Sequence, residues 1–246
     1  ILVLSKYFSL RHIEVSRIRH LIISGLYVFF PLVLLLLQPE LGYILIISLV
    51  WLVIIMVAGI RLKHLIVLAL ITLLVFSISW FYLLKDYQRE RVVSFLNPGL
   101  DPLGRGYHII QSIIAIGSGE IFGRGLGHGT QSQLNFLPEQ HTDFILATIA
   151  EEWGFLGSAF ILILFGVLFF RLIKISLSSS NNFARLFTLG VATMISVQAI
   201  INIAMNMGLL PIIGIPLPFL SYGGSNLIMN FIALGIIQSI VIRNKA

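Results

Sequence analysis

The sequence contains no cysteine and few charged residues, and both shortages restrict the class of protein. Only 11% of its 246 residues are charged and 58% are hydrophobic, whereas a soluble domain carries roughly 25% charged residues. Such a chain has too little polar surface for a soluble globule, and the lack of cysteine excludes a disulfide scaffold. The composition therefore indicates an integral membrane protein.

The charges that are present separate long apolar runs. A helix crosses the hydrocarbon core with about 20 residues, and uncharged runs of at least nearly this length cover 21–39, 41–60, 65–84, 153–170 and 186–242. The last run is long enough for two passes, and its Pro- and Gly-rich segment 207–225 must lie at an interface or line a protein cavity. These runs predict an all-α, polytopic transmembrane helical bundle of six full spans, preceded by the remnant of another span.

Most of the 16 basic residues fall on one side of these runs, which is the cytoplasmic side because Lys and Arg collect there. This side holds the C-terminus and Lys6, Arg11, Arg17, Arg19, Arg61, Lys63, Arg171, Lys174, Arg185, Arg243 and Lys245. The net charge of +6 is therefore a topology signal, and no nucleic-acid partner is expected. The chain opens inside an apolar stretch without Met, which we interpret as part of a longer protein.

The segment 85–143 is predicted to be a large extracytoplasmic loop, too long for a passive linker. Within it, isoleucines at helical spacing in 107–117 predict a short helix lying in the headgroup region. Such a helix would hold the loop where a lipid-linked substrate is met.

Asp143 stands at the start of the helix that leads into the span 153–170. Ala147 and Ala150 share its helical face and would leave room for a substrate. The alternative is that Thr142 or Asp143 only caps this helix, as such residues commonly do. Glu151 lies near the hydrocarbon boundary, where an acid is costly and often functional, although solvation or pairing with a loop arginine would also explain it.

Two features of the loop could bind anions. Arg89 and Arg91 suit phosphate or pyrophosphate, but pairing with Asp86 and Glu90 is equally compatible with the sequence. The alternating glycines of 123–129 could cradle phosphate, although we favour a plain turn.

The three external histidines, His108, His128 and His141, lack the spacing of a zinc site. The loop acids leave an oxygen-ligated divalent cation, Mg²⁺ or Mn²⁺, as a candidate cofactor.

Several motifs in order along nearly the whole chain resemble the SEDS family of membrane proteins, which includes RodA, FtsW and the sporulation homologue. They are Gln38-Pro-Glu-Leu-Gly42, Asp86-Tyr-Gln-Arg-Glu-Arg-Val92, Asp101-Pro-Leu-Gly-x-Gly-Tyr-His-Ile-Ile-Gln-Ser112, Ile114-Ala-Ile-Gly-Ser-Gly119, Gly129-Thr-Gln-Ser-Gln-Leu134, Phe136-Leu-Pro-Glu-x-His-Thr-Asp-Phe144 and Pro216-Leu-Pro-Phe-Leu-Ser-Tyr-Gly-Gly-Ser225. The Gly-Tyr-His and Thr-Gln-Ser-Gln-Leu segments are similar to the rod-shape branch.

The resemblance implies a single membrane domain over 1–246, part of a ten-span, inverting peptidoglycan glycosyltransferase of the cytoplasmic (inner) membrane. It would polymerise lipid II on undecaprenyl-pyrophosphate-linked glycan at the outer face, for cell elongation. Its partners would be a class B penicillin-binding protein, which is a transpeptidase, and other elongation-complex membrane proteins. Because the family's first spans are absent, we expect the chain alone to be inactive.

The resemblance assigns the family's essential acid to Asp143, which we predict to be the catalytic base. Glu40 replaces an aspartate that is common in the family's first motif. The predicted substrate-binding residues are Arg91, Arg89, Gln111, Glu139, His141, Thr142, Glu40 and Glu151.

Two other classes of function remain open. A lipid II flippase would need polar groups along its spans, and 41–60 and 65–84 offer little beyond Ser and Thr. A non-catalytic scaffold for a transpeptidase would use the loop 85–143 for docking alone, and would keep its activity in cells without Asp143.

Overall fold

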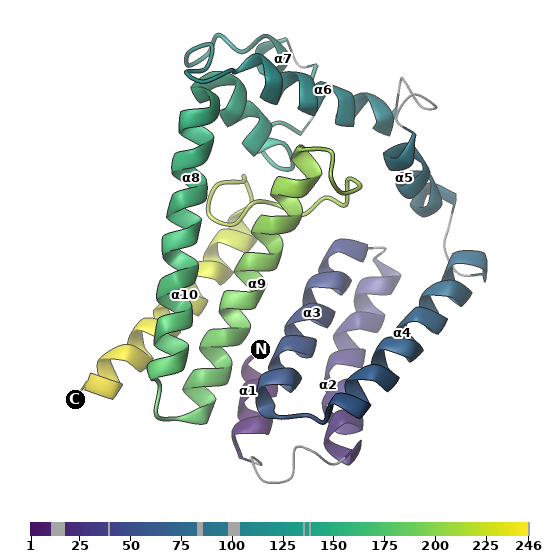
Figure 1. The fold of residues 1–246 in the computed structure, drawn as a ribbon, viewed down its shortest axis with the longest axis vertical. Helices are drawn as coiled ribbons and strands as arrows, with labels where there is room; N and C mark the ends of the chain where they lie inside the picture. The colour runs from purple at the N-terminus through teal and green to yellow at the C-terminus, as the bar shows by residue number, and fades with distance from the viewer. Residues whose placement is uncertain are drawn as a thin grey trace. The chain divides into compact units, whose positions relative to one another are not determined.

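The computed structural model describes residues 1–10, 18–38, 40–82, 86–97, 104–134, 136–137 and 139–245. These residues form helices and irregular connections without any β-strand, as the composition predicts. The helices of this part of the chain, drawn in Figure 1, are α1 (Leu2–Ser9), α2 (Ile18–Leu37), α3 (Leu41–Ala58), α4 (Leu62–Tyr82), α5 (Asp86–Leu96), α6 (Arg105–Ser118), α7 (Thr130–Gln133), α8 (Ile145–Ser178), α9 (Asn182–Asn206) and α10 (Gly224–Lys245).

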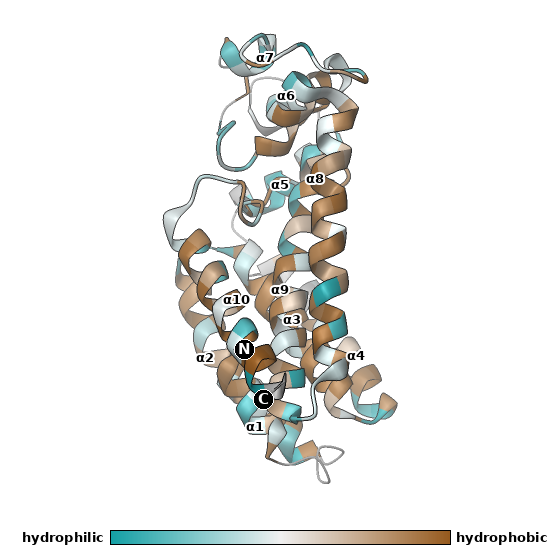
Figure 2. Cartoon of the chain, turned by 90° about the vertical axis from the view of Figure 1, so that its left-hand side faces the viewer, coloured by the Kyte–Doolittle hydropathy of each residue, from teal (hydrophilic) through white to brown (hydrophobic). Residues whose placement is uncertain are grey.

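Six of these helices, α2, α3, α4, α8, α9 and α10, overlap the six predicted spans. Among the described residues, five have the length and hydropathy of a membrane span, and in α4 the apolar stretch Leu62–Val75 is shorter. Figure 2 shows the apolar character of α8 along most of its length. The count of six spans and the orientation of the termini stay predictions, and part of the basic signal, in 11–17, lies outside the described residues.

The long uncharged run is divided as predicted. The helix α9 ends at Asn206 and α10 begins at Gly224, with irregular backbone from 207 to 223 between them. Proline lacks the N–H that a helix needs, so Pro211, Pro216 and Pro218 prevent one continuous helix here.

The chain forms two compact units, which are described separately. Unit 1 comprises Ile1–Leu84, Phe170–Val197 and Ile232–Ala246, and unit 2 comprises Lys85–Phe169 and Gln198–Phe231. The single domain expected for 1–246 stays a prediction.

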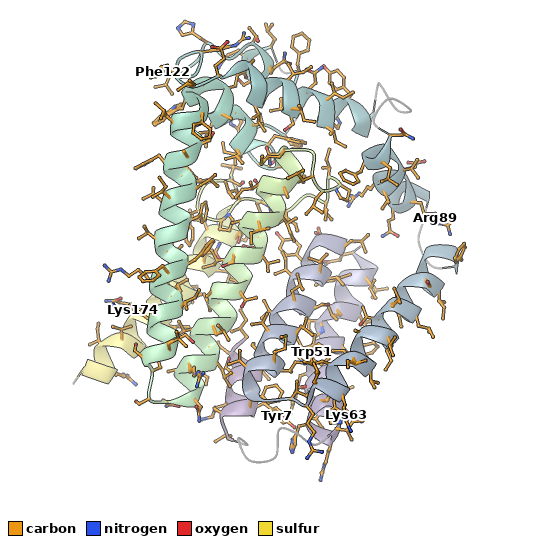
Figure 3. All side chains as sticks on the ribbon, viewed as in Figure 1. Tyr7, Trp51, Lys63, Arg89, Phe122 and Lys174 are labelled. Carbon is orange, nitrogen blue, oxygen red and sulfur yellow. The ribbon has the colours of Figure 1, made fainter. Side chains whose placement is uncertain are left out.

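In unit 1, the short helix α1 packs against α2 and α3. The Tyr7 hydroxyl lies 2.8 Å from Nδ1 of His20, and the indole Nε1 of Trp51 donates a hydrogen bond to Oγ of Ser24 at 3.2 Å. Tyr7 and Trp51 are labelled in Figure 3. These bonds satisfy polar atoms inside an otherwise apolar helix packing, which fixes the contacts of α2 with its neighbours.

In unit 2, α6 runs across the end of α8 (Figure 1). Ala115 of α6 belongs to a buried cluster with Leu137, Phe144 and Ala147. The predicted helix 107–117 corresponds to α6, whose Ile110, Ile113 and Ile114 are exposed. A helix with small residues toward the protein and exposed isoleucines elsewhere is compatible with a place in the headgroup region, which stays a prediction.

The helix α8 is kinked at Gly154, where φ is 66° and ψ is −162°. The preceding loop supplies the bonds that the kink breaks. The N–H groups of Phe155 and Leu156 donate to the carbonyls of Glu120 and Ile121 at 2.8 and 3.2 Å. In return, the carbonyls of Glu151 and Glu152 accept the N–H groups of Arg124 and Gly125 at 2.9 and 3.0 Å. The kink is therefore a defined junction with all four backbone groups satisfied.

Candidate functional site

Asp143 lies in a tight turn that leads into α8. The carbonyl oxygen of Glu139 accepts the N–H groups of Thr142, Asp143 and Phe144 at 3.1, 3.1 and 3.2 Å. The Thr142 hydroxyl donates to Oε2 of Glu139 at 2.8 Å. Glu139 itself has φ of 52°, a left-handed conformation that is uncommon for a residue other than glycine. Such backbone strain occurs often at functional sites.

The carbonyl groups of the three residues 141–143 are held from the other part of unit 2. The Tyr222 N–H donates to the carbonyl of His141 at 2.8 Å, and Oγ of Ser221 donates to that of Thr142 at 2.6 Å. The carbonyl of Asp143 accepts Nδ2 of both Asn202 and Asn206, each at 2.9 Å. We call these donors, from Asn202, Asn206, Ser221 and Tyr222, the carbonyl clamp.

The clamp also shows which side chain bonds an N–H group at the start of α8, where the sequence suggested Thr142 or Asp143. The Ala147 N–H near the start of α8 donates to Oδ1 of Asn206 at 3.1 Å, and the Thr142 hydroxyl is bonded to Glu139. Among the described residues, a side chain from α9 therefore caps this N–H. Capping by Thr142, considered from the sequence, is not what its hydroxyl does here.

The carboxyl group of Asp143 is half-buried, and three effects act on its pKa. Burial removes water from the charged form and is the largest cause of a raised pKa, the nearby charge of Glu139 raises the pKa further, and the Arg91 guanidinium lowers it. The net result is a pKa above the ordinary value for aspartate. A carboxylate with a raised pKa is a better proton acceptor near neutral pH.

The same electrostatics separate the two candidate arginines of α5. The Arg91 guanidinium is close enough to lower the pKa of the Asp143 carboxyl group. Arg89 is two positions earlier, and two residues turn a helix by about 200°, so its side chain leaves α5 on nearly the opposite side. Figure 3 shows Arg89 on the outer side of α5. The alternative partner Asp86 has a side chain outside the described residues.

Ala147 and Ala150 do not leave the open space expected beside Asp143. Both are buried, Ala147 in the cluster with Phe144 and Ala150 with its carbonyl against Gly119. This expectation was wrong because α6 and the loop after it pack on that face of α8. The residue that lies near the carboxyl group is Gly214, where a Cβ atom would be 3.6 Å from Oδ2 of Asp143.

Glu151 is fully buried, and its carboxylate binds the loop. Oε1 accepts the Gln131 N–H at 2.8 Å and Oε2 accepts the Ser132 N–H at 3.0 Å. The Thr130 hydroxyl is 3.4 Å from Oε1. These contacts hold the start of α7 on α8, and the predicted substrate contact of Glu151 stays a prediction.

The glycines of 123–129 form turns. Gly123, Gly125 and Gly127 have positive φ, and the N–H groups of Gly125 and Gly127 donate to the carbonyl and Oε1 of Glu152. Backbone donors that are already bonded to α8 are not available to a phosphate, which supports the turn interpretation.

The other predicted residues are dispersed. Gln111 is half-buried on α6, and His141 is exposed within the Asp143 turn. Glu40 is exposed at the N-terminal end of α3, in unit 1. Among the described residues, no group of three His, Cys, Asp or Glu side chains is placed to hold a metal ion. The candidate divalent cation therefore stays a prediction.

The sequence reasoning missed Asn202, Asn206 and Ser221. The signal was present, because two asparagines four positions apart occur in an uncharged run and lie on one face of a helix. Polar residues inside a membrane span are expensive and usually have a function or a partner.

Comparison with known proteins shows the family to which the chain belongs. The family model FtsW/RodA/SpoVE, described as cell cycle protein, matches residues 1–246. The chain is 44% identical over 218 residues to "Peptidoglycan glycosyltransferase MrdB" of Escherichia coli K12, covering 89% of this chain and 59% of MrdB. It is 40% identical over 238 residues to "Stage V sporulation protein E" of Bacillus subtilis, covering 96% of this chain and 64% of that protein.

Two solved structures share the fold. One, described as "Structural coordination of polymerization and crosslinking by a peptidoglycan synthase complex", has 37% identity and a TM-score of 0.79, covering 98% of this chain and 66% of that one. The other is RodA of Thermus thermophilus, with 27% identity and a TM-score of 0.64, covering 99% of this chain and 63% of that one.

The chain thus spans 59% of the length of MrdB, and the family model matches all of its residues. Five apolar helices among the described residues, together with these relatives, make it a multi-pass membrane protein. The chain belongs to the FtsW/RodA/SpoVE family of cell cycle proteins.

Proposed function

We propose that the full-length protein is a peptidoglycan glycosyltransferase that polymerises lipid II at the outer face of the cytoplasmic membrane, with Asp143 as general base. The observation that carries this proposal is the half-buried Asp143 carboxyl group, with its raised pKa, beside Arg91. The names of MrdB and of the FtsW relatives as peptidoglycan glycosyltransferases support it.

In this proposal, Asp143 takes the proton of the 4-hydroxyl of the acceptor GlcNAc. The hydroxyl oxygen forms a bond with C1 of the MurNAc on the lipid-linked strand. The bond from C1 to the pyrophosphate oxygen breaks, and undecaprenyl pyrophosphate leaves with the electron pair and inversion at C1. A positioned base contributes about 10²–10⁴-fold to such a step.

The leaving pyrophosphate needs positive charge, and Arg91 is the candidate that lies near Asp143. Preorganised charge at the group that develops negative charge is often the largest contribution to catalysis. A Mg²⁺ or Mn²⁺ ion is the second candidate. Mg²⁺ is commonly bound through one or two carboxylates plus substrate phosphates, and Glu139 and Asp143 would hold it here.

We assign the protein to cell elongation, with a class B penicillin-binding protein as its transpeptidase partner and further elongation-complex membrane proteins. The similarity to RodA of Thermus thermophilus, which is described as a rod shape determining protein, supports this assignment. The similar structure of a peptidoglycan synthase complex supports the transpeptidase partner. Depletion of the protein in its own organism should give loss of rod shape. A block in septation with normal shape would instead place it in division.

The test is strand formation from lipid II by the full-length protein purified with its transpeptidase. We expect polymer from wild type and from Glu120→Gln, which changes an exposed acid of the same unit, and none from Asp143→Asn. Polymer from all three proteins would return Asp143 to a structural role. Lipid II translocation without polymer would favour a flippase, and neither activity would favour a scaffold.

A further inference from the structure

A side chain of α9 caps the start of α8 and at the same time holds the backbone of Asp143. Ala147 is the third residue of α8, and the first N–H groups of a helix have no partner within it. The Asn206 amide lies between the Ala147 N–H and the Asp143 carbonyl. Its Oδ1 accepts the Ala147 N–H at 3.1 Å, and its Nδ2 donates to the Asp143 carbonyl at 2.9 Å.

The inserted amide is itself fixed on every side. Nδ2 of Asn206 also donates to the main-chain carbonyl of Asn202 at 2.8 Å and lies 3.2 Å from its Oδ1. The main-chain carbonyl of Asn206 accepts the Ser112 hydroxyl at 2.8 Å, which holds the backbone beneath the amide. Nδ2 of Asn202 donates to the carbonyls of Asp143 and Ile215 at 2.9 and 2.8 Å. The main-chain N–H of Ala147 can only donate, and the main-chain carbonyl of Asp143 can only accept. These two partners therefore determine the orientation of the Asn206 amide.

The Ser221 hydroxyl of the clamp also has both a hydrogen-bond acceptor and a donor as partners. Oγ of Ser221 donates to the Thr142 carbonyl at 2.6 Å and accepts the Leu217 N–H at 2.7 Å. Asn202 and Asn206 are fully buried. A buried polar network in which every member is bonded is rigid and specifies one geometry.

The contacts that the clamp makes to the Asp143 turn end on main-chain atoms. They hold the carbonyls of Thr142 and Asp143 and the N–H of Ala147. Burial alone does not need an asparagine at 206, because a leucine would fill the space with an apolar side chain. Without the Asn206 amide, the Ala147 N–H loses its acceptor and the Asp143 carbonyl loses one of its two donors. The backbone that carries the Asp143 carboxyl group is then held less firmly.

We propose that Asn206, supported by Asn202 and Ser221, is a positioning residue that sets where the Asp143 carboxylate meets the acceptor hydroxyl. This inference rests on the proposed function of Asp143. A displacement of about 1 Å in a reacting group can cost about 10²-fold in rate. Loss of the clamp therefore lowers kcat and leaves substrate binding in place.

The test compares Asn206→Leu with Asn230→Leu in the full-length protein with its transpeptidase. Asn230 is also a fully buried asparagine of unit 2, and its Nδ2 donates to Oδ1 of Asn226 rather than to the Asp143 turn. We expect Asn206→Leu to lower kcat for lipid II about 10²-fold, with KM within about twofold and a cooperative melting transition in detergent above the assay temperature. Asn230→Leu should keep the wild-type kcat.

A second pair of variants covers the case in which Asn206→Leu does not fold. Ser221→Ala removes the donor to Thr142, and Ser221→Thr keeps a hydroxyl at the same position. Ser221 is half-buried rather than fully enclosed, so we expect the added methyl group to be accommodated. We expect Ser221→Ala to lower kcat about tenfold, roughly the value of one net hydrogen bond of about 1–1.5 kcal/mol, and Ser221→Thr to restore it.

The outcomes separate this inference from the proposed function. If wild type makes no polymer, the function itself is wrong. If wild type is active and Asp143→Asn is inactive, normal kcat in folded Asn206→Leu, or in Ser221→Ala, would overturn the positioning role alone. An equal loss of kcat in Asn206→Leu and Asn230→Leu would also overturn it, since burial and not the clamp would then explain the loss.

Discussion

Asp143 and Glu151 lie eight positions apart around the N-terminal part of α8, and the structure uses them in opposite ways. The Glu151 side chain is fully buried and accepts hydrogen bonds from Gln131, Ser132 and Thr130. The hydrogen bonds that hold Asp143 among the described residues end on its backbone, at its N–H and its carbonyl.

The difference shows how a structural acid can be told from a reactive one. A carboxylate that accepts several backbone N–H groups is already used as a hydrogen-bond acceptor, and its loss leaves buried donors unsatisfied. An acid whose backbone is fixed while its carboxyl group is half-buried keeps that group for a substrate. Both acids belong to the segment that leads into the predicted span 153–170, so their position in the sequence does not separate them.

The largest expected effect is the loss of activity in Asp143→Asn. Asparagine keeps the size of the side chain and both backbone bonds to the clamp, but it does not accept a proton at neutral pH. We expect kcat to fall about 10²–10⁴-fold, with Tm in detergent unchanged within a few degrees. A large fall in Tm would mean that Asp143 is structural like Glu151, and the comparison would fail.

Glu151→Ala is expected to destabilise the loop, whereas Asp143→Asn is expected to remove activity without destabilising the protein. Two buried N–H groups, those of Gln131 and Ser132, would lose their acceptor, at about 1–3 kcal/mol each. The loop should become sensitive to limited proteolysis between α6 and α8 in the assembled protein. Glu152→Ala is the control, because it removes one bond, to the exposed Gly127 N–H. Equal protease resistance of the two variants would contradict the structural role of Glu151.

The kink of α8 gives a prediction of intermediate size. Gly154 has a conformation that is essentially restricted to glycine, which costs another residue about 1–3 kcal/mol, and its Cβ would also meet backbone atoms of Ile121 and Gly123. We expect Gly154→Ala to lower Tm. Gly166→Ala on the same helix has nothing within 4 Å of the new Cβ and should stabilise by about 0.5–1 kcal/mol. Equal Tm values would show that the kink is not required.

Much of the fold could be predicted from the sequence, because hydropathy alone places the apolar helices. The break at 207–223 followed from three prolines, and the glycine turns of 123–129 from the need for positive φ. The importance of Asp143 came from a family motif, whereas spacing alone left a helix cap as an alternative.

The remaining features depend on contacts between distant segments. Asn206 is far from Ala147 in the chain, so no local pattern shows that its amide caps the start of α8. The packing of Ala147 and the burial of Glu151 likewise depend on where α6 and α7 lie. Local periodicity describes one element at a time, and these roles arise where several elements meet.

The smallest expected effect is a pair of opposite shifts in the pH dependence of strand formation. The base acts in its deprotonated form, so activity rises with pH through the pKa of Asp143, which the structure raises. Glu139→Gln removes a charge that raises this pKa, and we expect the acid limb of the kcat profile to move to lower pH. Arg91→Gln removes a charge that lowers the pKa, and the acid limb should move to higher pH.

The pH at which kcat falls on the acid side does not depend on the maximum value of kcat. Arg91→Gln can therefore be tested although it should also lower kcat, because it removes the charge that would stabilise the leaving pyrophosphate. Arg89→Gln is the control for charge on α5, since its side chain points away from that of Arg91, and its limb should stay in place. A limb that moves in the same direction for Glu139→Gln and Arg91→Gln would mean that another group limits the rate at low pH. Opposite movement would show that the titrating base feels both charges, as the Asp143 carboxyl group does.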